Sequence, residues 1–241
     1  MLQIRNLTKK YGEKCAVDGL TLQIRPGELC AFIGHNGAGK TTTLKACCGI
    51  LDFDEGEIFV DGKSIRTEPL ECKKIMAYVP DNPDLYEYIT GEAYLNFVCD
   101  VYQIPQAERA QTVGRYAKIL EMEDSLNQLI SSYSHGMKQK LALIAALSHH
   151  PKLIIMDEPF VGLDPKAAHQ VKEIMHEHCA EGGAIFYSTH VLEVAEKLCD
   201  RVAIIKNGKL IRSGTMEEVR GDATLEDVFL ELEDDHAVET D

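Results

Sequence analysis

The sequence predicts an α/β fold, and three observations support this prediction. Short apolar, β-like runs alternate along the chain with longer stretches of helical periodicity. Some of the short runs are continuously apolar, which is typical of strands buried on both faces of a parallel sheet. The 241 residues, 45% hydrophobic and 27% charged, form an ordinary globular mixture that can bury a core without disulfides or metals. A disordered chain and a miniature domain are both excluded.

Five strands and one helix are expected in the first eighty residues. The strand-like runs cover residues 2–5, 21–24, 28–33, 57–60 and 75–79. The run ELCAFI at 28–33 has the pattern of a buried strand, and a glycine-rich turn separates it from a helical stretch over about 40–49.

The chain changes character between about residues 82 and 150. Helical periodicity extends over 91–102, 106–120 and 136–148, and no convincing strand lies among them. The composition is not that of a linker, so we expect a helical subdomain, over about residues 82–150, inserted into one domain of residues 1–225. Strands resume at 153–156, 184–187 and 201–205, and Asn207-Gly208 between two β-like runs predicts a hairpin.

The net charge of −14 is concentrated at the C-terminal end. Eight of the 39 acidic side chains, and no Lys or Arg, lie within residues 226–241, which we expect to form an acidic helix or tail. An acidic chain lacks the clustered Lys and Arg needed for non-specific nucleic-acid binding or for docking on anionic lipid. We therefore expect no nucleic-acid partner. Whether the acidic end extends a docking element or is a solvated tail stays open.

The sequence further predicts a cytosolic protein. The longest apolar run, 141–147, falls far short of the roughly 20 residues of a membrane-spanning helix. No apolar stretch follows the N-terminal charges as it would in a signal peptide. The eight cysteines form no C-x-x-C pair and are expected to be reduced, mostly buried thiols.

The strongest motif is a complete G-x-x-x-x-G-K-[ST] match that runs from Gly34 to Thr41. Glycines let backbone N–H groups curl around phosphate oxygens, and the following helix start adds its positive dipole end. Lys40 would reach the β- and γ-phosphates, and Thr41 would offer its hydroxyl to Mg²⁺. A plain glycine-rich turn is disfavoured because the motif joins a buried strand to a helix. The predicted phosphate-binding residues are Gly34, His35, Asn36, Gly37, Ala38, Gly39, Lys40, Thr41 and Thr42.

The second motif is a pair of adjacent carboxylates, Asp157 and Glu158, at the end of the apolar run 153–156. Ligand sites in α/β proteins lie at the carboxyl ends of such strands. Asp157 is placed to hold Mg²⁺ through water, and Glu158 is placed to orient and polarise an attacking water. An ordinary strand end with two solvated acids is the alternative, and the phosphate motif weakens it.

Over about residues 2–220 the chain then resembles the ATP-binding subunits of ABC transporters. Ser134-His135-Gly136-Met137 occupies the place of the family signature Ser-Gly-Gly-Gln and opens a helix ahead of the Asp157 strand. Ser134 and Gly136 match the signature, whereas His135 and Met137 depart from it. In the family this segment contacts the γ-phosphate held by the other subunit of a head-to-tail dimer, and the resemblance implies the same role here.

Further positions match the family pattern one by one. Tyr11 resembles the aromatic residue that stacks on adenine, with Val17 near the ribose. Asp164 resembles the loop residue that meets the partner subunit. His190 resembles the switch histidine that contacts the γ-phosphate and holds Glu158 and the water in line. Without the family, these residues would be interpreted as parts of turns, helix starts and strand ends.

Asp81 departs from the family, which usually places Gln there as a contact to Mg²⁺ and water. A carboxylate can still accept hydrogen bonds from metal-bound water, so Asp81 joins Thr41 and Asp157 as a predicted metal contact. The following stretch, 83–92, resembles an exporter-like subgroup and would form the groove that receives a cytoplasmic helix of the permease.

The resemblance implies a P-loop NTPase sheet core with an antiparallel β-subdomain and an inserted α-helical subdomain. It also implies an ATPase with ATP and Mg²⁺ as cofactors, a second ATP-binding subunit (identical or paralogous) and a transmembrane permease, with export as the direction. The protein would be cytoplasmic, peripheral on the inner face of the cell membrane, and would touch the membrane only through the permease. Two rivals are a permease-free ABC-type ATPase acting on ribosomes or DNA, and an unrelated P-loop kinase or GTPase.

Overall fold

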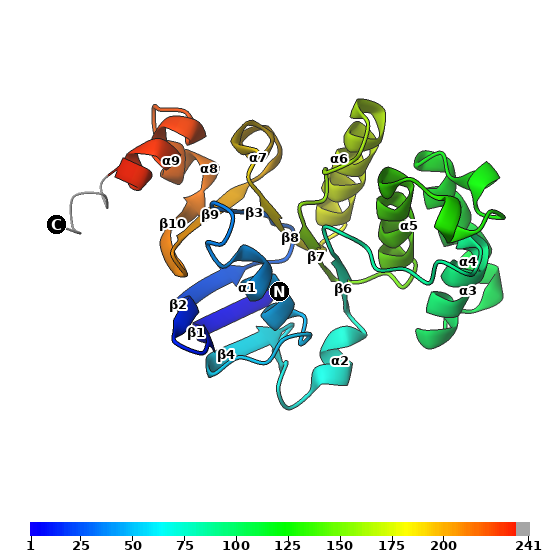
Figure 1. Ribbon diagram of the computed structural model, residues 1–241, viewed down its shortest axis with the longest axis horizontal. Helices are drawn as coiled ribbons and strands as arrows, with labels where there is room; N and C mark the ends of the chain where they lie inside the picture. Colours follow the sequence, from blue (N-terminus) through cyan, green and yellow to red (C-terminus); the bar gives the residue numbers. More distant parts are fainter. Residues whose placement is uncertain (235–241) are drawn as a thin grey trace.

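The computed structural model describes residues 1–234 and contains two sheets that lie on either side of helix α1 (Figure 1). The larger sheet has six strands in the order β10-β9-β3-β8-β7-β6. Its strands are parallel except β10, which forms an antiparallel hairpin with β9. They are β3 (Leu29–Ile33), β6 (Met76–Val79), β7 (Leu153–Asp157), β8 (Ala184–Thr189), β9 (Arg201–Lys206) and β10 (Lys209–Thr215).

The smaller sheet is antiparallel, in the order β2-β1-β4-β5. Its strands are β1 (Leu2–Tyr11), β2 (Lys14–Ile24), β4 (Glu55–Val60) and β5 (Lys63–Ser64). The first two are longer than predicted, because β1 continues past register shifts between Ile4 and Leu7 that interrupt its alternating pattern. The predicted combination of a mainly parallel core and an antiparallel β-subdomain is confirmed.

The three helices expected between residues 82 and 150 are present. They are α3 (Gly91–Val101), α4 (Gln106–Ile119) and α5 (His135–Leu147), and they lie together on the side of β6 away from α1 (Figure 1). The remaining helices are α1 (Lys40–Cys47), α2 (Pro69–Lys73), α6 (Pro165–Ala180), α7 (Leu192–Leu198), α8 (Met216–Arg220) and α9 (Leu225–Asp234). The acidic end predicted at 226–241 is thus helical up to Asp234, and its last part, 235–241, lies outside the described residues.

Alternate residues of the large sheet face two separate cores. In β3, Ala31 and Ile33 join a core with α5 and α6, whereas Cys30 and Phe32 join a second core with α1 and the small sheet. All four side chains are at most 1% exposed. The continuous apolar run at 28–33 therefore reflects a strand covered on both faces.

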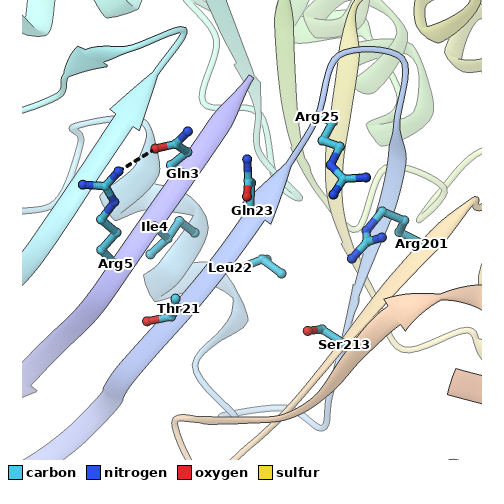
Figure 2. A pocket seen from close by; sticks show the side chains of 9 residues that line it. All are labelled: Gln3, Ile4, Arg5, Thr21, Leu22, Gln23, Arg25, Arg201 and Ser213. Carbon is cyan, nitrogen blue, oxygen red and sulfur yellow. Dashed lines mark hydrogen bonds between the residues drawn. The ribbon is translucent and has the colours of Figure 1, made fainter. Parts of the chain in front are cut away.

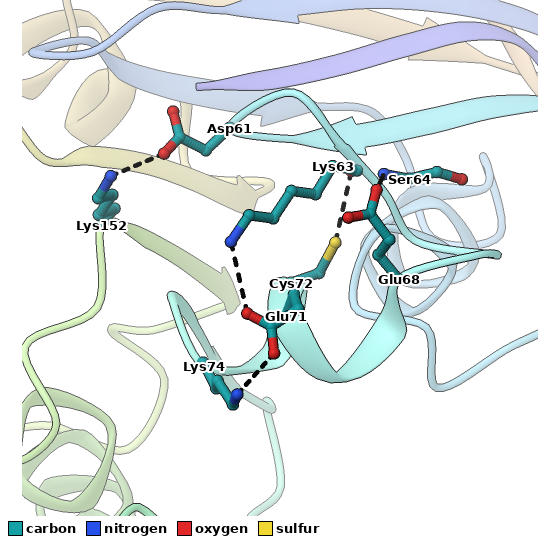
Figure 3. A network of polar contacts seen from close by, with 8 residues as sticks. All are labelled: Asp61, Lys63, Ser64, Glu68, Glu71, Cys72, Lys74 and Lys152. Atoms are coloured by element: carbon teal, nitrogen blue, oxygen red, sulfur yellow. Dashed lines mark hydrogen bonds and ion pairs between the residues drawn. The ribbon is translucent and has the colours of Figure 1, made fainter.

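Short elements were not predicted: β5, α2, α7 and α8 have two to seven residues each, too few to show a periodicity. Helix α2 is held by surface ion pairs of Glu71, 2.5 Å from Lys74 and 3.6 Å from Lys63 (Figure 3). Nearby, Lys152 donates to Asp61 at 2.7 Å and so joins the start of β7 to the turn between β4 and β5 (Figure 3).

The cysteine prediction is confirmed. All eight are free thiols, seven of them buried and Cys15 partly exposed. Burial raises the pKa of Cys30 to about 12, which keeps this thiol protonated and unreactive at neutral pH. Separately, no helix within residues 1–234 is long and apolar enough to cross a membrane.

Candidate active site

A hollow of about 310 Å³ lies where the loop after β3 meets the end of β7. It collects side chains from four distant parts of the sequence, including most of the predicted phosphate-binding residues and both predicted carboxylates. The lining residues are Tyr11, Lys14, Ala16, His35, Asn36, Gly37, Gly39, Lys40, Thr41, Thr42, Asp81, Asp157 and Glu158. Separate motifs thus converge on one cavity.

Two glycines of the loop before α1 are sterically required. A Cβ on Gly34 would lie 2.4 Å from the carbonyl oxygen of Ile205, and one on Gly39 would lie 2.4 Å from that of Ala16. Gly39 also has φ +111°, a backbone conformation that favours glycine. The loop is therefore packed directly against the backbone of β9 on one side and β2 on the other.

Lys40 is buried beneath this loop, with 6% of its surface exposed. Its Nζ donates to the carbonyl oxygens of Gly34 at 2.6 Å and His35 at 3.1 Å. Burial lowers the pKa of Lys40, and the negative charges of Glu158 and Asp157 oppose that shift. The lysine thus braces the loop and holds its ammonium group beside the two carboxylates.

The start of α1 leaves backbone donors available. Its N-cap is Gly39, and no side chain caps the first turn. Thr41 Oγ1, also in this turn, donates to Asp157 Oδ2 at 2.6 Å, and the other carboxylate oxygen of Asp157 accepts from Ser188. A hydroxyl and a carboxylate are hard oxygen donors, the type that Mg²⁺ prefers.

Glu158 and His190 form a close pair at the edge of the hollow. His190 Nδ1 lies 2.9 Å from Glu158 Oε1, and the Glu158 side chain is 14% exposed. Glu158 has φ +47°, which is rare for a residue other than glycine, and its N–H donates to Ser188 Oγ at 3.1 Å. The backbone is thus held in a strained conformation that aims this carboxylate.

The remaining residues predicted near the nucleotide separate into two groups. Tyr11 is 50% exposed and, with the exposed Asp81, lines the hollow. Val17 does not line it: this side chain is fully buried and packs beneath Gly39. Val17 therefore supports the loop from the core.

The signature residues Ser134, His135, Gly136 and Met137 are not among those that line the hollow. They start α5, which lies across β6 and β7 from α1 (Figure 1). Ser134 caps the helix by accepting from the N–H of Met137 at 3.3 Å. A Cβ on Gly136 would lie 2.6 Å from the carbonyl oxygen of Gly162, so this helix start packs on the loop before α6.

Asp164 is the N-cap of α6. Its carboxylate accepts from the N–H groups of Lys166 at 3.0 Å and Ala167 at 2.9 Å. These backbone donors, that of Ala167 above all, lower the pKa of Asp164. Asp164 therefore caps α6. It follows the loop on which the signature segment packs through Gly136.

Three residues of the site were missed by sequence reasoning. Lys14 and Ala16 line the hollow from the start of β2, where no motif marks them. Ser188, which donates a hydrogen bond to Asp157, could have been found, because β7 and β8 are neighbouring parallel strands and pair these two residues.

A second hollow, of about 330 Å³, contains Arg25 and Arg201, whose guanidinium groups face each other (Figure 2). It holds none of the predicted site residues, and Glu28, 3.7 Å from Arg201, offsets part of its positive charge.

Comparisons with known proteins identify the family of the chain. The family model for ABC transporters matches residues 17–161. The ABC-type transporter ATP-binding protein EcsA of Bacillus subtilis is 33% identical, over 96% of each chain. The Nod factor export ATP-binding protein I of Burkholderia orbicola is 35% identical, over 88% of this chain and 70% of the relative.

Solved structures agree as well. An ATP-binding subunit of an ABC transporter superimposes with a TM-score of 0.93 at 34% identity, covering 97% of this chain and 99% of the other. The ATP-binding cassette MJ0796, dimeric in a post-hydrolysis state with ADP and Pi, gives a TM-score of 0.81 at 25% identity, covering 90% of this chain and 99% of the other. The chain belongs to the ABC transporter family, as an ATP-binding subunit with ATPase activity.

Proposed function

We propose that the hollow between the phosphate loop and β7 binds Mg²⁺-ATP, and that hydrolysis there drives a separate membrane permease in the direction of export. One observation carries the proposal. The same cavity is lined by Lys40, Thr41, Asp157 and Glu158. His190 Nδ1 lies against the carboxylate of Glu158. The loop and the uncapped helix start offer backbone N–H groups to phosphates, and Lys40 adds a positive charge.

The residues present fit Mg²⁺. Thr41 and Asp157 already lie 2.6 Å apart, and Asp81 lines the same hollow. Within residues 1–234 no three His, Cys, Asp or Glu side chains gather as a metal site, so phosphate oxygens and water would complete the ligand set. A bound Mg²⁺ would neutralise charge on the β- and γ-phosphates.

Glu158 and His190 would carry the chemistry. Glu158 would accept a hydrogen bond from the attacking water and align it with the γ-phosphate, with His190 fixing the carboxylate through the 2.9 Å contact. Because phosphoryl transfer needs little covalent help, catalysis here rests on positioning and charge stabilisation.

A second ATP-binding subunit, identical or paralogous, would complete each site. The signature segment and Asp164 lie together on a surface separated from the chain's own phosphate loop. Ser134 and the start of α5 would therefore contact ATP held by the partner. The dimeric arrangement of MJ0796 with ADP and Pi supports this reading.

The permease would dock beside α3. Four large apolar side chains are exposed here: Tyr86, Tyr88, Phe97 and Leu129 are 62%, 93%, 47% and 50% exposed. The ring of Tyr86 packs against Phe97 and against Tyr94, and Tyr94 lines a hollow of about 270 Å³ between residues 77–85 and helices α3 and α5. Exposed aromatic residues beside a cavity suit an apolar partner segment. The protein would then lie at the inner face of the cell membrane, and the export-related name of one relative supports that direction.

The replacement Glu158→Gln tests the proposed site. It keeps size and shape but removes the negative charge that polarises the water, so we expect hydrolysis to fall by at least about 100-fold. ATP binding, measured by calorimetry, should persist, and the ATP-bound protein should accumulate as a dimer in size-exclusion chromatography.

The matched control is Glu173→Gln, an exposed glutamate of α6 that does not line the hollow. It should hydrolyse ATP at the rate of the unmodified chain. Steady-state hydrolysis retained in Glu158→Gln would overturn the assignment of the catalytic carboxylate.

A further inference from the structure

We propose that Phe229, in the C-terminal helix α9, is a positioning residue for the phosphate loop, so that this helix sets the affinity for ATP. The proposal rests on the proposed role of the hollow. The rings of Phe229 and His35 meet edge to face, with centroids 5.4 Å apart and planes at 65°. His35 lines the hollow, and Phe229 comes from the other end of the chain.

Helix α9 is a fixed support, held at both ends. At its start, the N–H of Leu225 donates to Glu196 Oε2 of α7 at 3.1 Å. At its last turn, Lys206 Nζ of β9 donates to the carbonyl oxygen of Leu232 at 3.1 Å. Leu225 and Val228 are at most 4% exposed. Phe229 therefore approaches the loop from an anchored helix.

The contact reaches Lys40 through the backbone of His35. The carbonyl oxygen of His35 accepts from Lys40 Nζ and from the N–H of Ala38, both at 3.1 Å. A rotation of His35 would move the carbonyl that orients the lysine. Gly34 and Gly39 on either side are packed against neighbouring backbone, whereas His35 meets Phe229 through its ring. Phe229 thus supports the part of the loop nearest the lysine contact.

An aromatic pair of this geometry changes an equilibrium by about two- to tenfold. Phe229 does not line the hollow, so its loss should weaken nucleotide binding without removing a group that reacts. We expect an effect on KM and Kd for ATP and little effect on kcat.

The experiment compares Phe229→Ala with Leu230→Ala, a 55% exposed neighbour on the same helix. Phe229→Ala should raise KM in steady-state hydrolysis, and Kd for a fluorescent ATP analogue, by about two- to tenfold, with kcat within about twofold. Leu230→Ala should match the unmodified chain, and Phe229→Tyr, which keeps the ring, should restore affinity.

A Phe229→Ala variant with unchanged KM, or a Phe229→Tyr variant as weak as Phe229→Ala, would overturn the proposal. If Phe229→Ala folds poorly, a double-mutant cycle tests the pair with Phe229→Leu, which removes the ring but keeps an apolar side chain, with His35→Ala, and with both changes together. Coupled, non-additive effects on Kd support it, and additive effects contradict it. Lys40→Ala distinguishes a failure of the proposed ATP site from a failure of the proposed role of Phe229. If Lys40→Ala still binds ATP, the proposed site is overturned. If Lys40→Ala loses ATP binding while Phe229→Ala binds ATP normally, only the proposed role of Phe229 is overturned.

Discussion

The nucleotide edge (residues 34–42 with Asp157, Glu158 and His190) and the helical segment α3–α5 are built in different ways. At the nucleotide edge, backbone groups and short side chains are fixed by close contacts, and Lys40 is only 6% exposed. The helical segment has an equally buried interior but presents large apolar side chains such as Phe97 on its surface. The first region is organised around a small ligand, and the second leaves an outer face suited to a protein partner.

The largest effect should follow the loss of the loop lysine. In Lys40→Ala a buried positive charge and two hydrogen bonds to the loop disappear, so the affinity for ATP should fall by on the order of 100-fold or more. Calorimetry with ATP measures it. Lys45→Ala, one turn later in α1 and outside the hollow, should bind normally. Equal affinity in the two variants would contradict the special role of the nucleotide edge.

The interior of the helical segment should matter for stability rather than for binding ATP. Leu141 of α5 is fully buried, so Leu141→Ala should lower the free energy of unfolding by about 2–5 kcal/mol in urea titrations. Leu129→Ala removes the same atoms from a half-exposed position and should change it by less than about 1 kcal/mol. Similar losses in both variants would mean that the segment lacks a packed interior.

His149, which follows α5, should make the stability depend on pH. Burial lowers the pKa of its ring to about 4, and the ring stacks on Tyr102 and donates from Nε2 to the Met76 carbonyl at 3.2 Å. Below pH 6.5 the unfolded chain binds a proton that the folded chain excludes, so stability falls as the pH falls from 7 to 5. The share of this one histidine is roughly 2 kcal/mol.

His149→Phe keeps a ring against Tyr102 and removes the titrating group. The loss of unfolding free energy between pH 7 and pH 5 should therefore be smaller by roughly 2 kcal/mol than in the unmodified chain. His169→Gln, at an exposed histidine of α6, is the matched control for the removal of one histidine. A His149→Phe chain with an unaltered pH dependence would show that His149 titrates normally when folded.

The smallest effect on the chain itself should come from its most exposed aromatic residue. Tyr88 is 93% exposed, so Tyr88→Ala should shift the unfolding free energy by less than about 0.5 kcal/mol. If this surface binds the permease, a smaller amount of the Tyr88→Ala variant than of the unmodified chain should remain bound to washed membranes. Full recovery would move the docking surface elsewhere, and a large loss of stability would mean that Tyr88 packs within the chain.

The nucleotide edge could be predicted because its chemistry is encoded locally. One short motif contains the glycines, Lys40 and Thr41, and the continuous apolar run before it predicts a strand. The helices α3, α4 and α5 were predicted for a similar reason, because their periodicity extends over eleven residues or more, whereas α6, with 16 residues, was not predicted.

Contacts between distant segments that neither a motif nor strand pairing marks could not be predicted. No pattern in the sequence shows that Phe229 meets His35, or that Lys14 lines the hollow. Val17 was expected near the ribose, and the structure shows this side chain fully buried in the core behind Gly39. Short elements such as α2 were missed because packing and ion pairs, rather than sequence period, hold them.

The backbone contact between Gly136 and Gly162 has a mechanical consequence. With 2.6 Å from a would-be Cβ at Gly136 to the carbonyl oxygen of Gly162, and the ring of His135 packed against Gly162, the start of α5 lies in close contact with the loop before α6. We expect the loop before α6 and the start of α5 to move together, and α5 extends away from this contact as one rigid helix. A displacement of the loop before α6 would therefore be transmitted along α5. The far end of this helix lies some 20 Å away at 1.5 Å per residue.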